Sequence, residues 1–341
     1  MAKKSKRKEA SIKSSILVLL LILILLISST YAWFTANKKV TVSSLNVNVE
    51  AKNGLQISTD AKTWKTVITN EDITSAAYAP DGEANANQLP NQLSPVSTAK
   101  GVTGGQLDFF LGSLEANEKK GGAFELSATT EPKETKGTSG NFIAFDLYFK
   151  VTTPIQLNLE QTSDVVEITE AGQAGTALEK NGGLPSASRI ALVNEGNLAD
   201  GNTDTKQYTN MMNGNAGTTI IWEPNNDLHK PEAIVNARDS LGVASPQGEQ
   251  PTYGVAAEIA KEKAIAANQT QQSTPGTLTE VTNDIKSAST GLGSDIALTN
   301  LNLQAGITKV RVYMWIEGQD IDCENSASGS NVRFDLKFNI A

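Results

Sequence analysis

Two residue types with useful side-chain chemistry are nearly absent from this chain of 341 residues, which has one cysteine, Cys323, and one histidine, His229. A single cysteine excludes an internal disulfide, so the folded domain must be held together by its apolar core. We expect Cys323 to be buried, because free cysteine is among the most buried residue types. A disulfide between two chains is the alternative.

The shortage of histidine also limits the catalytic classes open to this chain. His229 stands in a proline-bounded segment, and no Gly-x-Ser-x-Gly motif accompanies it, so a Ser-His-Asp triad is not expected. Zinc hydrolases need several clustered ligands, and no glycine-rich phosphate loop opens a helix. Paired carboxylates, which a glycosidase needs, are frequent in any acidic chain and are usually just solvated. We therefore predict a protein that is not an enzyme.

Charge is missing from Ser14 to Asn37, and twelve consecutive Ile, Leu and Val residues fill positions 16–27. Six of the first thirteen residues are basic. A cationic segment stays at the cytoplasmic face while the apolar segment enters the bilayer. The apolar run is shorter than the ~20 residues of a spanning helix and fits the core of a secretory signal. Residues 1–33 are therefore predicted to be an export signal, which makes the remainder secreted or cell-surface.

Small residues at Thr30 and Ala32 form the pattern that signal peptidases read. This pattern predicts cleavage after Ala32, with Trp33 as the mature N-terminus. An uncleaved signal anchor is the alternative, because residues 28–36 extend the apolar segment to membrane length. In either case membrane contact is expected only through residues 14–36.

Acidic residues dominate the part of the chain that follows the signal. Residues 1–32 hold six basic groups and one acid, which leaves 23 basic and 36 acidic residues and a net charge of −13. This charge repels phosphate backbones, so nucleic acid is not an expected partner. It favours a soluble surface and leaves room for bound cations.

Alternating apolar and polar residues recur along the chain and predict β-strands with one buried face. In Lys39–Glu50 the alternation slips at Ser43-Ser44, which predicts a β-bulge. In Asn141–Thr152 one register is wholly apolar and must face the core. Gly54–Ser58 and 63–68 look like a hairpin that turns near Asp60. Further strands are expected at 124–130, 155–159, 165–168, 189–193 and 218–222.

Many strands and one convincing helix, at 255–267, predict an all-β fold, either a jelly-roll or a Greek-key β-sandwich with long loop inserts. The expected organisation has three parts: an apolar signal helix at 1–33, which is a signal peptide or signal anchor, an N-terminal arm and first strand at 34–50, and the sandwich at 51–341. Inserts are expected within the sandwich at about 70–105, 170–215 and 225–290. Residues 70–105 and 270–294 are rich in polar and turn-forming residues, and we expect them to be loops.

The last segment predicts two paired strands, 309–317 and 332–340, with a turn between them. Acidic residues gather at this turn: Glu317, Asp320, Asp322 and Glu324. Oxygen ligands at alternate positions of a flexible loop suit a hard cation such as Ca²⁺. The spacing is not that of an EF-hand, so the preferred interpretation is a solvated turn without a cofactor, beside a buried Trp315.

The segment Thr30-Tyr31-Ala32-Trp33-Phe34-Thr35, followed by the alternating residues 39–49, resembles the start of TasA/camelysin-type exported proteins. The resemblance covers residues 1–50. It implies export through a dedicated signal peptidase of the SipW type, a mature N-terminus at Phe34 and a jelly-roll domain. Some members polymerise into extracellular fibres of the biofilm matrix, each subunit lending its N-terminal strand to the next. Camelysins have been described as metallopeptidases, but this chain has no His-Glu-x-x-His motif, and the activity is not carried over.

A fibre also has a physical basis in the residues themselves. Cleavage releases a strand-forming arm that can complete the sheet of a neighbouring copy, with Val40 and Val42 as the donated apolar residues. Repeated donation does not close on itself, so it generates filaments of a homopolymer. The arm can instead pair within its own sheet. The alternative function is a tethered or secreted monomer that binds a surface, as an adhesin does, through its long loops.

Overall fold

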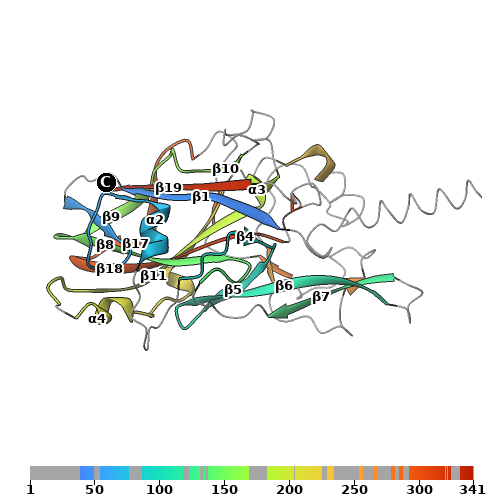
Figure 1. Ribbon diagram of the computed structural model, residues 1–341, viewed down its shortest axis with the longest axis horizontal. Coiled ribbons are helices and arrows are strands. Elements are labelled where there is room, and N and C mark those ends of the chain that lie inside the picture. Colours follow the sequence, from blue (N-terminus) through green and yellow to red (C-terminus); the bar gives the residue numbers. More distant parts are fainter. Residues whose placement is uncertain are drawn as a thin grey trace, which may run out of the picture.

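The computed structural model describes residues 39–49, 54–76, 87–117, 123–130, 134, 137–168, 183–202, 204–224, 229–233, 253–255, 265–266, 278–280, 284–286, 292–318, 320, 322–323 and 331–340. The predicted signal, with Thr30, Ala32, Trp33 and Phe34, lies outside these ranges. Among the described residues, no helix has the length and apolar character needed to cross a membrane. Strands dominate the described chain and helices are short, so the all-β prediction is confirmed (Figure 1).

One layer of the sandwich is a seven-stranded sheet in which the first and last described strands lie side by side (Figure 1). β1 (Val40–Val49) runs parallel to β19 (Asn331–Ile340). The order of the sheet is β17 (Ile296–Leu303), β9 (Ile155–Leu159), β19, β1, β3 (Val67–Ile68), with β10 (Asp164–Ile168) also paired to β19 and β4 (Gln92–Leu93) also paired to β1.

The facing layer is a six-stranded sheet centred on β18 (Gly306–Ile316). β18 pairs antiparallel with β11 (Ser188–Leu198) on one side and β8 (Ile143–Val151) on the other. The order of this sheet is β16 (Asp284–Lys286), β12 (Thr219–Glu223), β11, β18, β8, β2 (Gln56–Ser58).

The main core fills the space between these two sheets. Alternate residues of the facing strands supply it, and the rings of Phe149 and Phe338 meet edge to face with centroids 5.7 Å apart. These side chains are exposed by 1% or less: Phe145, Leu147, Phe149, Phe334, Leu336 and Phe338. The wholly apolar register predicted for residues 141–152 therefore faces the core, and the apolar residues of β19 face it from the other sheet.

The second face of the six-stranded sheet is buried as well. A four-stranded sheet, made of β14 (Ile265–Ala266), β7 (Ala123–Thr130), β6 (Gln106–Asn117) and β5 (Ser97–Thr103), contributes to its cover. Phe109 of β6 stacks on Phe142 at 4.2 Å and meets Trp315 edge-on at 5.3 Å between ring centroids. Because this face is covered, the polar register of β8 and β18 also lies inside the protein.

The prediction that 309–317 and 332–340 pair with each other was wrong. Both strands exist, as β18 and β19, but they belong to different layers. The physical reason is that β8 and β11 occupy both edges of β18 and leave no ladder of hydrogen bonds for β19.

The helix predicted at 255–267 was wrong at both of its described ends. Val255 closes the short strand β13 (Tyr253–Val255), which pairs with β15 (Leu278–Glu280), and Ile265–Ala266 forms β14, which pairs with β7. Pairing with a neighbouring strand outweighs local helix propensity here, because propensity amounts to less than ~1 kcal/mol per residue. Residues 256–264 and 267 lie outside the described ranges.

The segments predicted to be loops contain secondary structure. Residues 70–105 hold α2 (Asn70–Ser75), β4 and β5, while 270–294 hold β15 and β16. α2 begins at a capping box in which the Thr69 hydroxyl accepts a hydrogen bond from the amide of Asp72. The predicted insert 170–215 includes α3 (Leu184–Ala187), β11 and α4 (Lys206–Thr209). Each of these segments contains at least one strand that pairs with another strand of the fold, and composition does not reveal such pairing.

The hairpin predicted at 54–68 is confirmed only near its turn. The backbone amides and carbonyls of Ile57 and Lys65 bond reciprocally, and Ala61 has a φ of 56° in the bend between them. Beyond this bend β3 leaves β2 and pairs with β1 in the other sheet. The segment therefore links the two layers.

Candidate functional site

We call the surface that receives the first strand the β1 seat: β19 on one side of β1, and β3 and β4 on the other. Eight residue pairs join β1 to β19, from Thr41–Asn331 to Val49–Phe338. Only two pairs each join it to β3 and β4. Most of the backbone pairing of β1 is therefore with the last strand of the chain.

The predicted bulge in β1 is confirmed. The register with β19 shifts between Val42 and Ser44. The extra residue brings Val40, Leu45 and Val47 to the same buried face, with 2%, 2% and 0% of each residue exposed. Val42 is partly buried and packs against the main core.

The predicted donor residues Val40 and Val42 are therefore only the first half of the apolar face of β1. Leu45 lies opposite Phe334 and Val47 opposite Leu336, both in the main core. The sequence signal for these two residues was the second alternating run, which continues the same face once the bulge is taken into account.

The acidic turn after β18 is not the solvated turn that we preferred from sequence. Glu317 is fully buried and accepts a hydrogen bond from the Trp315 indole N–H at 3.0 Å. Asp322 is 1% exposed, and its amide donates to the Asp320 carboxylate at 2.9 Å. Glu324 lies outside the described residues. The carboxylates turn inward because basic groups from other segments lie beneath them.

His229 is one of those groups, and sequence reasoning did not connect it with the acidic turn. Its Nδ1 lies 2.6 Å from Oδ2 of Asp322, and both side chains are at most 1% exposed. Burial and the negative charge of Asp320 raise the pKa of Asp322. Burial alone would lower the pKa of His229, but the hydrogen bond and charge of Asp322 reverse this and raise it. The pair therefore holds a shared proton more tightly than either group in water.

Arg189 of β11 is the second basic group under this turn. Its Nη2 donates to Glu223 at 2.7 Å and to Asp320 at 2.6 Å, and the three side chains are at most 2% exposed. Burial acts to lower the pKa of this guanidinium, and the carboxylates of Glu223, Asp320 and Glu317 together raise it. Arg189 therefore stays charged and neutralises part of the acidic cluster.

Three of these groups could contact one cation. His229, Asp320 and Asp322 each present a ligand atom, and these atoms lie within 4.8 Å of one another. One nitrogen and two carboxylates suit a transition metal better than Ca²⁺, which takes six to eight oxygens. Arg189 already occupies Asp320, and His229 already occupies Asp322, so a metal would have to displace existing ion pairs.

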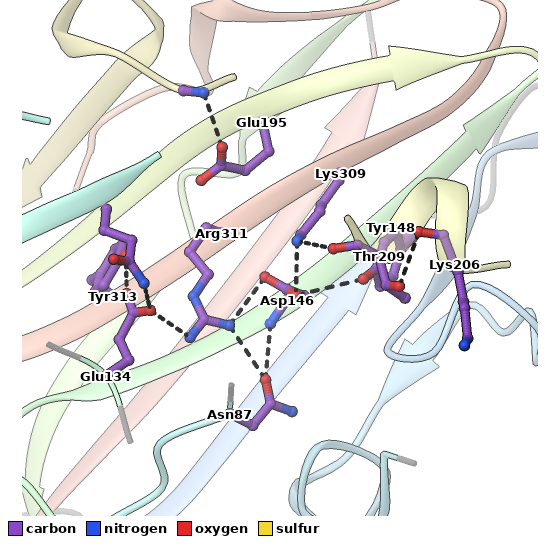
Figure 2. Close-up of polar contacts among 12 residues, drawn as sticks. Asn87, Glu134, Asp146, Tyr148, Glu195, Lys206, Thr209, Lys309, Arg311 and Tyr313 are labelled. Atoms are coloured by element: carbon purple, nitrogen blue, oxygen red, sulfur yellow. Dashed lines mark hydrogen bonds and ion pairs between the residues drawn. The ribbon is translucent and has the colours of Figure 1, made fainter. Parts of the chain in front are cut away.

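A second buried polar cluster lies on the covered face of β8 and β18 (Figure 2). Asp146 contacts Arg311 Nη1 through Oδ1 at 3.0 Å and Lys309 Nζ through Oδ2 at 3.2 Å. The other guanidinium nitrogen of Arg311 lies 3.5 Å from Glu134, which also accepts the hydroxyl of Tyr313. Sequence reasoning missed this cluster, because a polar register on a strand is ordinarily its solvent face.

Glu195 of β11 lies beside that cluster (Figure 2), at the position where the register with β18 shifts. Its Oε2 accepts the amide of Gly214 at 2.9 Å, and its Oε1 is buried without a hydrogen-bond partner among the described residues. Burial raises the pKa of Glu195 to about 7, against the opposing effects of the Gly214 amide and the charge of Lys309. Its charge therefore changes near neutral pH.

Cys323 is 5% exposed and belongs to the main core, so the prediction of a buried thiol is confirmed.

No protein-family model, curated protein or solved structure matches this chain. The likeness to TasA/camelysin-type proteins therefore rests on residues 1–50 alone, and the geometry of the β1 seat and of the two buried clusters is the basis for a functional conclusion.

Proposed function

We propose that this chain is an exported structural subunit of an extracellular or cell-surface fibre, assembled when each copy donates its first strand to the next. The observation that supports the proposal is the β1 seat. β1 lies between β19 on one side and β3 and β4 on the other, and its buried face completes the main core. An emptied seat exposes the edge of β19 and apolar surface, and the best occupant for it is another copy of β1.

The connections of β1 make such an exchange feasible. β1 is the first described element, and only residues 50–55 join it to β2 in the opposite sheet. A copy whose β1 leaves its own seat can place it in a neighbour without breaking any other strand pairing. The resulting contact joins two different surfaces and leaves one free seat and one free strand at the ends, so it extends into a filament.

The remaining parts of this proposal follow from the export signal. Its partners are further copies of the chain and the signal peptidase that releases the arm at Trp33 or Phe34, and it contacts the membrane only through residues 14–36. The jelly-roll or Greek-key topology belongs to the same proposal, as does a place in a biofilm matrix. The parallel pairing of β1 with β19 supports a sandwich in which the first and last strands share one sheet.

Deletion of residues 34–49 removes the whole of β1 and tests strand donation. The shortened chain lacks Val40, Val42, Leu45 and Val47 and cannot fill a seat, but it still offers its own. We expect it to form no filaments alone and to shorten the filaments of the full mature chain when the two are mixed, as seen by electron microscopy. The Gln207→Ala variant is the control, because Gln207 is exposed on α4 and lies outside the seat.

Unaltered filaments from the shortened chain would exclude donation of this strand. A full mature chain that stays monomeric in every condition would instead favour the surface-binding module.

A further inference from the structure

Lys309 and Asp146 lie in contact on neighbouring strands, away from water. In the register between β18 and β8, Lys309 faces Tyr148 and Arg311 faces Asp146, so Lys309 and Asp146 are diagonal neighbours on one face of the sheet. Figure 2 shows Lys309 pointing toward Asp146. Lys309 Nζ is 3.2 Å from Asp146 Oδ2, and neither side chain is exposed to solvent.

A lysine amine and a carboxyl group held in this way are the two halves of an amide. In water the reverse reaction, hydrolysis, is favoured by the large excess of solvent. A dry site removes that excess of water. Fixed contact between the two groups also raises their effective concentration to ~10⁵ M or more. Burial of an ion pair is also costly by itself, and conversion to a neutral amide removes that cost.

We propose that Lys309 and Asp146 form an intramolecular isopeptide bond. The Nζ–Cγ bond forms and a Cγ–O bond of Asp146 breaks. The lysine ammonium gives up two protons, and both leave with the carboxylate oxygen as one molecule of water. The step needs no oxidant, reductant or other reactant, and a positive and a negative charge disappear together.

The groups around the pair suit each stage of this step. Arg311 Nη1 donates to Oδ1 of Asp146 at 3.0 Å, where it stabilises negative charge that develops on that oxygen when the amine attacks. The Tyr148 hydroxyl donates to Oδ2 at 3.5 Å, on the oxygen that leaves. Glu195 lies in the electrostatic field of both Lys309 and Asp146.

The bond would join β8 to the central strand β18 and close a long loop of chain. A covalent link of this kind restricts the unfolded state, as a disulfide does. This chain has one cysteine and cannot form an internal disulfide, so an amide is the cross-link open to it.

Mass spectrometry of the folded mature protein, with its N-terminus identified by sequencing, tests this proposal. We expect an intact mass lower than that of the sequence by one water, and a branched peptide that joins the Asp146 and Lys309 segments after protease digestion. The branched peptide also separates this bond from a cyclised aspartate, which loses water within one linear peptide. Full sequence mass and two separate linear peptides from the wild-type protein would overturn the proposal.

Three variants sharpen the result. Asp146→Ala and Lys309→Arg lack one of the reacting groups and are expected to keep their full sequence mass. Asp146→Asn is expected to lose ammonia instead of water, and its branched product then has the same mass as that of the wild type. A variant that does not fold leaves the conclusion intact, because the wild-type spectrum alone decides.

Discussion

Glu195 links the free energy of unfolding to pH at the scale of a single residue. Burial raises its pKa in the folded state from 4.5 to about 7. The folded chain therefore holds this proton more tightly than the unfolded chain does. The stability that results is fully present below about pH 4.5 and is lost as the pH rises to about 7. At most ~3 kcal/mol depends on this group.

The Glu195→Gln variant has the shape of the protonated glutamate side chain but no group that titrates. We expect its free energy of unfolding to fall less steeply between pH 4.5 and 7 than that of the wild type, as measured by urea unfolding at a series of pH values. Some slope should remain, because the raised pKa values of His229 and Asp322 act in the same direction. Glu232→Gln is the control, since Glu232 is exposed. Equal slopes in wild type and Glu195→Gln would contradict this assignment.

Arg189 neutralises carboxylates that have no access to water. Replacing it with methionine retains much of the apolar volume but leaves Glu223 and Asp320 without their cation. We expect the free energy of unfolding to fall by ~3–5 kcal/mol, because loss of one partner leaves uncompensated buried charge. Lys337→Met, at a partly exposed pair with Asp335, should cost less than ~1 kcal/mol in the same urea titration. A small loss at both positions would mean that water reaches the acidic turn.

At the scale of one strand, the bulge of β1 determines which side chains of that strand enter the core. Ser43 has no partner in the register of β1 with β19, so deleting it joins the two alternating runs into one and leaves Val40 on the face of Leu45 and Val47. Deleting Thr41 instead shifts Val40 to the opposite face if Val42, Leu45 and Val47 keep their places. We expect the Thr41 deletion to lose ~1.5–3 kcal/mol in urea unfolding, the stabilisation from burying one aliphatic side chain, and the Ser43 deletion, as the matched control, to lose less. A Thr41 deletion of unchanged stability would show that the N-terminal half of β1 adds nothing to the core.

Strand positions with a strong alternating pattern could be predicted from the sequence, and so could the bulge in β1. Alternation reports which face of a strand is buried, but it does not report the partner strand. The separation of β18 from β19 was missed for this reason. The sequence did not reveal that Asp146, Lys309 and Arg311 form a buried cluster. Charged residues are buried only when they are paired, and only the fold brings these three together.

The candidate residues of the acidic turn show the same limit. Glu317, Asp320 and Asp322 could be found from their spacing, but Arg189 and His229 come from segments far away in the chain. Charge compensation across such distances has no local sequence signal. A turn that looks solvated from its own residues is therefore buried in the folded protein.

For the whole molecule, the central feature is that the first and last described strands meet in one sheet. β1 pairs with β19 in a single copy, and the same pairing between copies produces a fibre. The interaction is identical in the two cases, so its geometry alone does not distinguish them. What differs is which chain supplies β1, and a covalent trap records that directly.

Paired cysteines at Asn48 and Lys337, which face each other across β1 and β19, make that measurement. Assembled fibres of the Asn48→Cys/Lys337→Cys variant are oxidised, denatured without reductant and separated by size. The control is Asn158→Cys/Asn339→Cys, which spans β9 and β19 within one copy. Strand donation predicts a ladder of covalent multimers for the β1 pair and only monomers for the control. Cross-linked monomers alone from the β1 pair would show that β1 stays in its own seat, and would contradict the proposed fibre assembly.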